Sequence, residues 1–287
     1  MTYSELLLSS AKKTGNILCM GLDPVADALP HPEKPITERI CDYFEELFQE
    51  MSSQGLIPAA FKPNLGYYAM LDRPLSGRFE GSLALARILA VLRELFPHIP
   101  VILDAKRGDI ATSSTNYARE AFESWQADCV TVSPYMGTDS VMPFAFEGKG
   151  VYVLDRTSNP GGADLQNRRM EEAEPLYITV ARTIAAWHAR HSGIGAVVGA
   201  TNLKELEDIA VFFADKGIPM LIPGVGTQGG SAPEVMAKLR GAGYPIALAR
   251  INSSSGITHP WKKAPAPADY AERALVNLEK LIRETSL

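Results

Sequence analysis

Two carboxylates and an amine follow an apolar run in the segment Val101-Ile-Leu-Asp-Ala-Lys-Arg-Gly-Asp109. On a β-strand, residues two apart share a face, so Asp104 and Lys106 should point the same way, and Asp109 should lie in the turn that follows. A structural segment gains little from such crowding, because unpaired like charges in a partly dry site are costly. We therefore predict an enzyme site in which an ammonium, held charged between carboxylates, acts as proton donor. A solvated loop of mixed charge is the alternative.

The composition is that of an ordinary globular protein. The chain has 287 residues, of which 46% are hydrophobic and 21% charged, and this excludes disordered and fibrous classes. The length suits one large barrel or two modest domains. A net charge of −5 argues against a nucleic-acid or membrane partner, but it leaves room for a basic pocket that binds one phosphate.

The cysteines and the N-terminus bear on the compartment. Cys19, Cys41 and Cys129 are far apart and lack any metal-ligand spacing, so we expect buried thiols in a reducing cytosol and no metal site. The first residues show no basic leader before a long apolar core, and no segment reaches the ~18 to 20 apolar residues that a membrane span needs. We expect a cytoplasmic protein.

Short apolar runs alternate with longer amphipathic stretches throughout. The apolar runs predict strands at 17–22, 57–62, 100–105, 129–133, 150–154, 195–199, 219–223 and 245–250. The amphipathic stretches predict helices at roughly 37–53, 81–96, 113–125, 138–147, 174–191, 202–215, 231–240 and 267–284. Eight strand-then-helix units in a row favour an α/β fold, a single (β/α)8 barrel that spans 1–287 as one catalytic domain.

An open doubly wound sheet is the alternative fold. Such a sheet usually carries a glycine-rich loop after its first strand, whereas the first strand here ends in Gly21-Leu-Asp-Pro24. The longer loops, 63–80 and 155–173, both follow strands, and this is the side on which barrel enzymes keep their active sites.

Polar residues end most of the predicted strands. In strand order they are Asp23, Lys62, Asp104 with Lys106, Ser133, Asp155 through Ser158, Pro223-Gly-Val-Gly226 and Arg250. Each has a structural interpretation by itself; Asp23 could cap a turn, for example, and Lys62 could extend its amine to solvent. Their common position at the same end of successive strands is what favours a shared site.

A glycine-rich loop follows the seventh predicted strand. The segment Pro223-Gly-Val-Gly-Thr-Gln-Gly-Gly230 carries four glycines in eight residues and precedes a helix. Glycine lets main-chain N–H groups approach an anion closely, and the helix adds its positive dipole end. Arg250, predicted to end the eighth strand, offers a bidentate fork for phosphate oxygens. We predict a phosphate site between the last two strands, with an ordinary turn as the alternative.

These residues resemble a known family. Asp104-Ala-Lys-Arg-Gly-Asp109 is similar to the Asp-x-Lys-x-x-Asp motif of the orotidine 5′-phosphate decarboxylases, in particular the longer bacterial group. The resemblance covers about residues 17–255 and includes the segments Gly21-Leu-Asp-Pro24, Phe61-Lys-Pro63, Ser158-Asn-Pro-Gly161 and Pro223-Gly-Val-Gly226. Hexulose-phosphate synthases and keto-gulonate-phosphate decarboxylases share the short motif, whereas Lys62, the Ser158 loop and Gln228 belong to the orotidine enzymes.

The resemblance implies roles for individual residues. Asp23 would bind the ribose, Lys62 would bridge the ribose and the carboxylates, Asp104 would face the substrate carboxylate, and Lys106 would deliver a proton to C6 of the pyrimidine. Asp109 and Ile110 would cross into the neighbouring subunit's site in a homodimer. Further implied substrate contacts are Ser113, which stands where the family usually has Thr and has Thr112 beside it; Ser158 at the pyrimidine edge; Gln228 between ring and phosphate; and Pro223, Gly224, Gly226 and Arg250 at the phosphate.

The implied reaction converts orotidine 5′-phosphate to UMP and carbon dioxide in pyrimidine biosynthesis, without metal or organic cofactor. Two alternatives stay open. One is a Mg²⁺-dependent sugar-phosphate aldolase or decarboxylase on the same barrel, which needs a further carboxylate ligand at a strand end. The other is a non-catalytic barrel that binds nucleotide phosphates.

Overall fold

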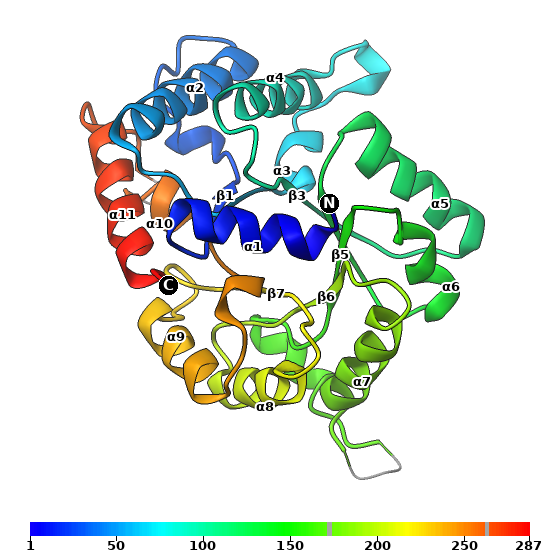
Figure 1. The fold of residues 1–287 in the computed structure, drawn as a ribbon. Coiled ribbons are helices and arrows are strands. Elements are labelled where there is room, and N and C mark those ends of the chain that lie inside the picture. Colours follow the sequence, from blue (N-terminus) through cyan, green and yellow to red (C-terminus); the bar gives the residue numbers. More distant parts are fainter. Residues whose placement is uncertain (171–173, 262–263) are drawn as a thin grey trace.

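A computed structural model describes residues 1–170, 174–261 and 264–287. Its core is one sheet of parallel strands in the order β2-β1-β8-β7-β6-β5-β4-β3, curled into a ring (Figure 1). The strands are β1 (Leu18–Leu22), β2 (Ala60–Pro63), β3 (Ile102–Arg107), β4 (Cys129–Val132), β5 (Gly150–Leu154), β6 (Ile194–Val197), β7 (Met220–Pro223) and β8 (Ala249–Ser253). The predicted (β/α)8 barrel is confirmed.

Helices form a ring outside the strands (Figure 1). Those that follow successive strands are α2 (Ile36–Gln54), α3 (Leu65–Ala69), α4 (Glu80–Leu95), α5 (Ala111–Arg119), α6 (Thr138–Val141), α7 (Leu176–His188), α8 (Leu203–Phe213), α9 (Ala232–Gly241), α10 (Ser255–Thr258) and α11 (Tyr270–Glu284). Helices outside and side chains inside bury both faces of the sheet, which explains why the strands read as continuous apolar runs. No helix among the described residues is long and apolar enough to cross a membrane.

The barrel closes between β2 and β3 without a continuous ladder. The two strands meet at isolated bridges, Phe61 with Val101 and Asn64 with Asp104. The Phe61 N–H donates to the Pro100 carbonyl at 3.0 Å. This junction is therefore a seam, in contrast to β1–β2 or β4–β5, where four consecutive residue pairs are in register.

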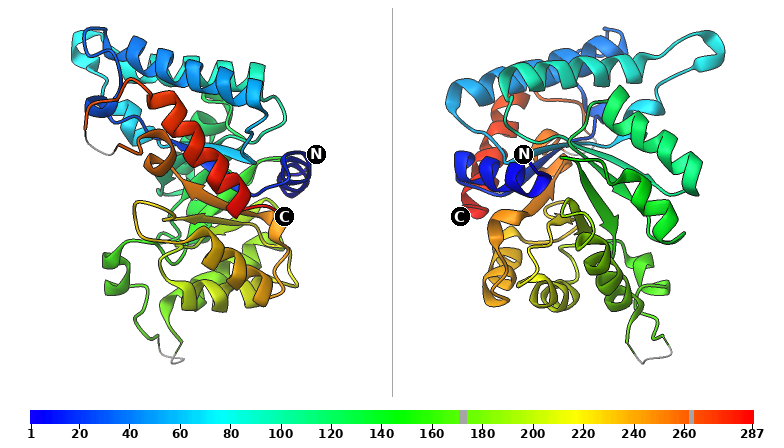
Figure 2. Two further views of the ribbon diagram at one scale, coloured as in Figure 1. Left: turned by 90° about the vertical axis from the view of Figure 1, so that its left-hand side faces the viewer. Right: turned by 45° about the vertical axis from the view of Figure 1, so that its right-hand side comes forward.

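An N-terminal helix, α1 (Tyr3–Thr14), covers one end of the barrel (Figures 1 and 2). Thr2 and Glu5 form a capping box at its start, and its own residues Leu7 and Ala11 are fully buried. No element was predicted there, because the helix adds no strand and stands outside the strand–helix alternation. The opposite end of the barrel, at the carboxyl ends of the strands, stays open to the loops.

Strand boundaries differ most from prediction at β2 and β8. The second strand was expected at 57–62 and is Ala60–Pro63, and the eighth was expected at 245–250 and is Ala249–Ser253. Residues 246–248 form a turn of 3₁₀ helix, so an apolar run there was mistaken for the strand itself. The shift at β8 changes which residues reach the open end of the barrel.

Candidate active site

A cavity of about 410 Å³ opens at the carboxyl ends of the strands. The residues that line it include the predicted strand-end groups Asp23, Lys62, Asp104, Lys106, Ser158 and Pro223, together with Gln228 of the glycine-rich loop. They come from the ends of β1, β2, β3, β5 and β7, so segments far apart in sequence meet at one end of the barrel. This is the position at which barrel enzymes carry their active sites.

A continuous chain of charges crosses this cavity. The Lys62 ammonium lies 2.8 Å from one carboxylate oxygen of Asp104, and the Lys106 ammonium lies 2.7 Å from the other. The Lys62 side chain is 4% exposed, whereas that of Lys106 is 51% exposed. Lys62 is thus a buried partner of Asp104, and Lys106 presents its ammonium to whatever enters the cavity.

The charges decide the protonation of the buried groups. Burial alone would raise the pKa of Asp104, but the ammonium groups of Lys62 and Lys106 outweigh burial and hold that pKa well below its usual range. Burial alone would lower the pKa of Lys62, but Asp104 and Asp23 outweigh it and raise that pKa above its usual value. Asp104 is therefore ionised and Lys62 charged at neutral pH.

The end of β3 is irregular where it carries these groups. Leu103 pairs with Val130 and Arg107 with Val132, so four steps along β3 face two along β4. The Thr131 hydroxyl accepts the N–H groups of Ala105 and Lys106 at 3.1 and 2.9 Å. It also donates to Asp104 at 2.9 Å.

Lys106 takes φ of 45°, a left-handed conformation that is uncommon for residues other than glycine. Backbone strain of this kind persists only where the surroundings enforce it, and it concentrates at functional sites. A bulge fixed by Thr131 thus brings Asp104 and Lys106 together, where a regular strand was predicted to do so.

Asp23 and Ser158 occupy opposite sides of the cavity. The Asp23 carboxylate follows β1 and accepts the Asn64 N–H at 3.2 Å. The Ser158 hydroxyl follows β5 and donates to the Gln228 side-chain oxygen at 2.7 Å, so the β5 loop contacts the glycine-rich loop. Both residues line the cavity, and their ligand contacts stay predictions.

The glycine-rich loop encloses a smaller polar chamber next to the main cavity. The chamber measures about 160 Å³, and Asp23, Tyr67, Gln228, Asn252 and Ser254 line both spaces. Its remaining lining comes from Val25, Gly224, Val225, Thr227 and Ser255. Gly226 has φ of 92°, a conformation that glycine adopts without strain, and it borders the adjoining surface groove.

Arg250 does not reach this chamber, and the prediction that it ends its strand and binds phosphate is wrong. It is the second residue of β8 and is fully buried at the closed end of the barrel. Its guanidinium donates to the backbone carbonyls of Leu7 and Ala59, at 2.6 and 3.2 Å, and to the Ser10 hydroxyl at 2.6 Å. Arg250 therefore anchors α1. Because β8 begins four residues later than predicted, Asn252 takes the corresponding place at the open end.

The predicted dimer-crossing residues lie beside the cavity and do not line it. Asp109 is partly buried, and its carboxylate accepts the N–H of Ile110 at 2.7 Å. The Ile110 side chain is 57% exposed. Ser113, in the first turn of α5, is partly buried and Thr112 is exposed. Within this chain Asp109 and Lys106 are not brought together.

Sequence reasoning missed several polar residues of the site. Thr131 was hidden inside an apolar strand, and the run Asn252-Ser-Ser-Ser255 was hidden by the misplaced boundary of β8. Asn64 and Tyr67 follow β2, whose end was also misplaced by one residue. Their signal was available, because each lies within a few residues of the carboxyl end of a strand.

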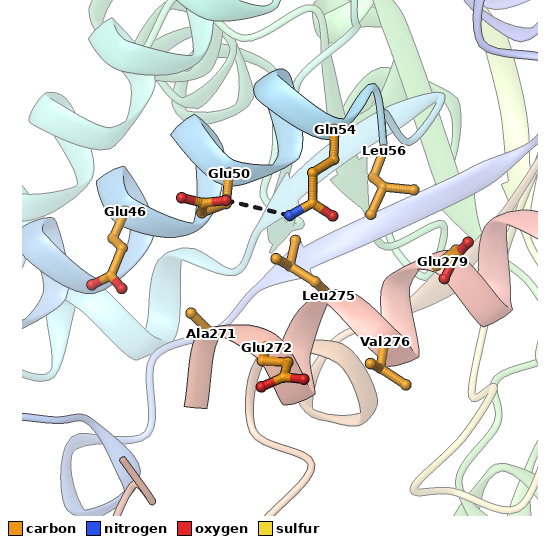
Figure 3. Close-up of a pocket in the computed structure, with 9 residues that line it drawn as sticks. All are labelled: Glu46, Glu50, Gln54, Leu56, Ala271, Glu272, Leu275, Val276 and Glu279. Carbon is orange, nitrogen blue, oxygen red and sulfur yellow. Dashed lines mark hydrogen bonds between the residues drawn. The ribbon is translucent and has the colours of Figure 1, made fainter. Parts of the chain in front are cut away.

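A second hollow lies on the outer surface between α2 and α11 (Figure 3). Glu46, Glu50, Glu272 and Glu279 stand around an apolar floor that includes Leu275, and Glu50 accepts a hydrogen bond from Gln54 at 3.3 Å. This hollow gathers charge of one sign and lacks the paired acid and base of the barrel cavity. The barrel cavity is therefore the stronger candidate for catalysis.

Fold and site together indicate a (β/α)8-barrel enzyme, with a lysine–carboxylate cluster at the carboxyl ends of its strands as the candidate active site. More particularly, the chain belongs to the orotidine 5′-phosphate decarboxylase / HUMPS family, whose model matches residues 18–250.

Curated relatives match nearly the whole chain. It is 40% identical over 278 residues to the orotidine 5′-phosphate decarboxylase of Variovorax paradoxus (strain S110), covering 96% of this chain and 94% of that protein. It is 38% identical over 263 residues to that of Delftia acidovorans (strain DSM 14801 / SPH-1), with 90% of each covered. Among solved structures, the Leishmania donovani OMP decarboxylase is 30% identical with a TM-score of 0.75, over 99% of both chains.

Proposed function

We propose that the protein decarboxylates orotidine 5′-phosphate to UMP and carbon dioxide, with Lys106 as the proton donor. The observation that carries this proposal is the Lys62–Asp104–Lys106 chain, at 2.8 and 2.7 Å, in a cavity of a chain that belongs to this enzyme family. The curated relatives named above carry the same activity in their names. Among the three linked side chains, Lys62, Asp104 and Lys106, that of Lys106 is the one that is half exposed at the cavity.

The chemistry requires a fixed positive charge. When the bond between C6 and the carboxylate breaks, carbon dioxide leaves and the electron pair stays on C6 in an in-plane orbital that the ring does not delocalise. The Lys106 ammonium stabilises that developing charge and then transfers its proton to C6. Asp104 and Lys62 are already paired before substrate binds, so the electrostatic environment needs little reorganisation during the reaction.

The cavity accommodates the rest of the substrate in a definite direction. We place the ribose near Asp23 and Lys62, the pyrimidine edge at Ser158 and the 5′-phosphate in the polar chamber beside the glycine-rich loop. The N–H groups of Gly224 and Val225, together with the hydroxyls of Thr227 and Ser255, are groups available to the phosphate there. Gln228 reaches both the ring and the phosphate, since it lines both spaces.

We propose that the active unit is a homodimer in which Asp109 and Ile110 complete the partner's site. Exposed apolar side chains support this proposal: Ile110 is 57% exposed and Tyr135 is 89% exposed. The loops that carry them are adjacent, because the Ser133 N–H donates to the Arg107 carbonyl at 2.7 Å. The buried free thiols Cys19, Cys41 and Cys129 support a reducing compartment such as the cytoplasm.

The alternatives receive no support. The Mg²⁺-dependent reaction would leave Lys62 and the Ser158 loop without a role, although both line the cavity. The curated relatives described above are named as decarboxylases of orotidine 5′-phosphate, and this favours a catalyst over a non-catalytic binding barrel.

An ultraviolet assay of orotidine 5′-phosphate tests the proposal. We expect consumption of the substrate with formation of UMP after exhaustive chelation, and no loss relative to the untreated enzyme. Loss of activity on chelation that Mg²⁺ restores would favour the metal-dependent alternative. Binding of UMP without turnover of orotidine 5′-phosphate would favour the binding barrel.

A further inference from the structure

The loop that carries Ser158 is held by a network centred on Arg156, a buried residue that does not itself line the cavity. Arg156 lies two residues before Ser158 and is 4% exposed. Its guanidinium donates to the Thr157 carbonyl at 2.8 Å and to the Asn202 side-chain oxygen at 2.9 Å. It also lies 3.5 Å from the Glu205 carboxylate. Arg156 therefore links the β5 loop to the start of α8.

Four backbone groups in and next to Ser158 are engaged by neighbouring residues. The Arg156 carbonyl accepts the Gly199 N–H at 2.7 Å, and the Thr157 N–H donates to the Gln166 side-chain oxygen at 2.9 Å. The Thr157 carbonyl accepts a second bond from the Asn202 amide at 3.1 Å. The Ser158 carbonyl accepts the Thr201 hydroxyl at 2.8 Å. Neighbouring loops thus fix the path of the chain through Ser158.

Steric contacts leave Ser158 little freedom. A Cβ atom on Gly199 would lie 2.6 Å from the Ser158 backbone, and one on Gly224 would lie 3.0 Å from the Ser158 Cβ. Ser158 is therefore packed between the loops after β6 and β7 while Arg156 and Asn202 hold the segment before it. A shift of the β5 loop would move the Ser158 hydroxyl away from Gln228, which it contacts at 2.7 Å.

We propose that Arg156 is the positioning residue for base recognition: through Thr157 and Asn202 it sets where the Ser158 hydroxyl meets the pyrimidine. The inference rests on the proposed function. The planar guanidinium suits the task, because it donates in fixed directions to three acceptors at once, counting the Gln166 oxygen at 3.3 Å. A lysine ammonium at the same place keeps the charge but does not reproduce that fork.

The test compares Arg156→Lys with Arg250→Lys. Both replace a buried arginine that donates to backbone carbonyls, but Arg250 lies at the closed end of the barrel. For Arg156→Lys we expect KM for orotidine 5′-phosphate to rise about tenfold to a hundredfold, the scale expected for an ångström-sized misplacement, with a smaller change in kcat. We also expect the preference for UMP over CMP as competitive inhibitor to fall. Arg250→Lys should lose thermal stability and keep the wild-type preference.

Two further variants keep the inference falsifiable if Arg156→Lys does not fold. Thr201→Val removes the hydroxyl that holds the Ser158 carbonyl at an exposed position, and it should lower the same preference. Ser158→Ala gives the limit of the effect, so Arg156→Lys and Thr201→Val added to Ser158→Ala should lower the preference no further. Losses that simply add, or an unchanged preference in both single variants, would overturn the inference. Failure of the wild-type enzyme to bind UMP would overturn the proposed function and the inference with it.

Discussion

Lys106 joins two properties that rarely occur in one residue. Its ammonium is half exposed to the cavity, and its backbone has φ of 45° at a bulge that Thr131 fixes from the neighbouring strand. A regular strand end would have left the side chain free to rotate along the barrel mouth. The bulge instead directs the ammonium to within 2.7 Å of Asp104, so the position of the charge is set before substrate arrives.

Replacing this lysine tests its role most directly. We expect Lys106→Ala to lower kcat by about 10²-fold or more, because the charge acts mainly as the carbanion develops. The variant should fold and bind UMP, since Asp104 keeps its bonds to Lys62 and Thr131. Calorimetric titration with UMP and the ultraviolet assay measure the two effects. Lys216→Ala, at a surface pair with Asp215, is the matched control. Near-normal turnover in Lys106→Ala would remove this residue from the mechanism.

Asp155 lies at the start of the loop that carries Ser158, and its carboxyl group differs from that of Asp104 in having no hydrogen-bond partner in the part of the chain that the structure describes. Its side chain is buried and neither carboxylate oxygen has a hydrogen-bond partner among the described residues. Burial raises the pKa of Asp155 well above its usual value, and the charge of Arg156 offsets this only in part. At a pH above the ordinary pKa of an aspartate, the folded protein therefore keeps a proton on Asp155 that the unfolded chain has released.

The sign of this linkage gives a prediction for Asp155→Asn. The carboxyl group has a higher pKa in the folded state than in the unfolded chain. Its contribution therefore lowers the free energy of unfolding as the pH rises above the pKa of the unfolded chain. The neutral amide removes that loss, so the variant should be more stable than wild type by about 1 kcal/mol or more at pH 8, with the difference shrinking towards pH 4. Thermal unfolding across this pH range measures it. A difference that grows on acidification would contradict the assignment.

At the level of residues, spacing alone predicted which chemical groups meet but not how they meet. Asp104 and Lys106 were paired from the period of a strand, and they do meet. The contact depends on a bulge fixed by Thr131, a residue whose β-branched side chain is ordinary in a strand. Hydrogen bonds between residues so distant in sequence leave no local pattern.

Among the elements, β8 shows how a boundary decides a function. An apolar run at 245–250 suggested a strand that ended in Arg250, but the chain first makes a turn of 3₁₀ helix and the strand continues to Ser253. Since strand side chains alternate, Arg250 and Asn252 share the inner face one layer apart. A shift of a few residues therefore moved an arginine from the open end of the barrel to its closed end. Arg250 is hydrogen-bonded to α1, and no pattern in the sequence predicted that helix.

This placement makes Arg250→Ala a stability variant. It would remove the buried hydrogen bonds that the guanidinium donates to the Leu7 and Ala59 carbonyls and to the Ser10 hydroxyl. We expect the free energy of unfolding to fall by about 3 kcal/mol or more, because several buried acceptors and much packing are lost together. Chemical denaturation measures this loss. The ratio of kcat/KM for orotidine 5′-phosphate to that for the phosphate-free nucleoside should not change, and a selective loss for the nucleotide would restore Arg250 to the phosphate.

At the scale of the whole molecule, the proposed dimer is testable by complementation. If Asp109 serves the partner's site, Lys106→Ala and Asp109→Ala subunits are defective for different reasons. Mixing them should rebuild one site per mixed dimer, while the other site carries both defects. For random pairing of equal amounts we expect about a quarter of wild-type activity, from the two-fold symmetry of such an assembly.

The control for this experiment is subunit exchange itself, followed by native mass spectrometry of chains that differ in mass. If exchange is complete and the mixture stays as inactive as its parents, Asp109 acts within its own subunit. The exposed Ile110 side chain would then need another explanation.

The seam between β2 and β3 has a consequence for how the molecule holds together. Lys62 belongs to β2 and Asp104 to β3, so their ion pair is also a side-chain cross-link over the junction where the backbone ladder is interrupted. A ligand that places a negative group next to Asp104 therefore acts on the ion pair that also holds β2 against β3. Ligand binding and closure of the β2–β3 junction are then thermodynamically coupled. Amide hydrogen exchange should find the β2–β3 junction opening more readily than β4–β5 in the free enzyme, and UMP, which lacks the carboxylate, should slow that opening.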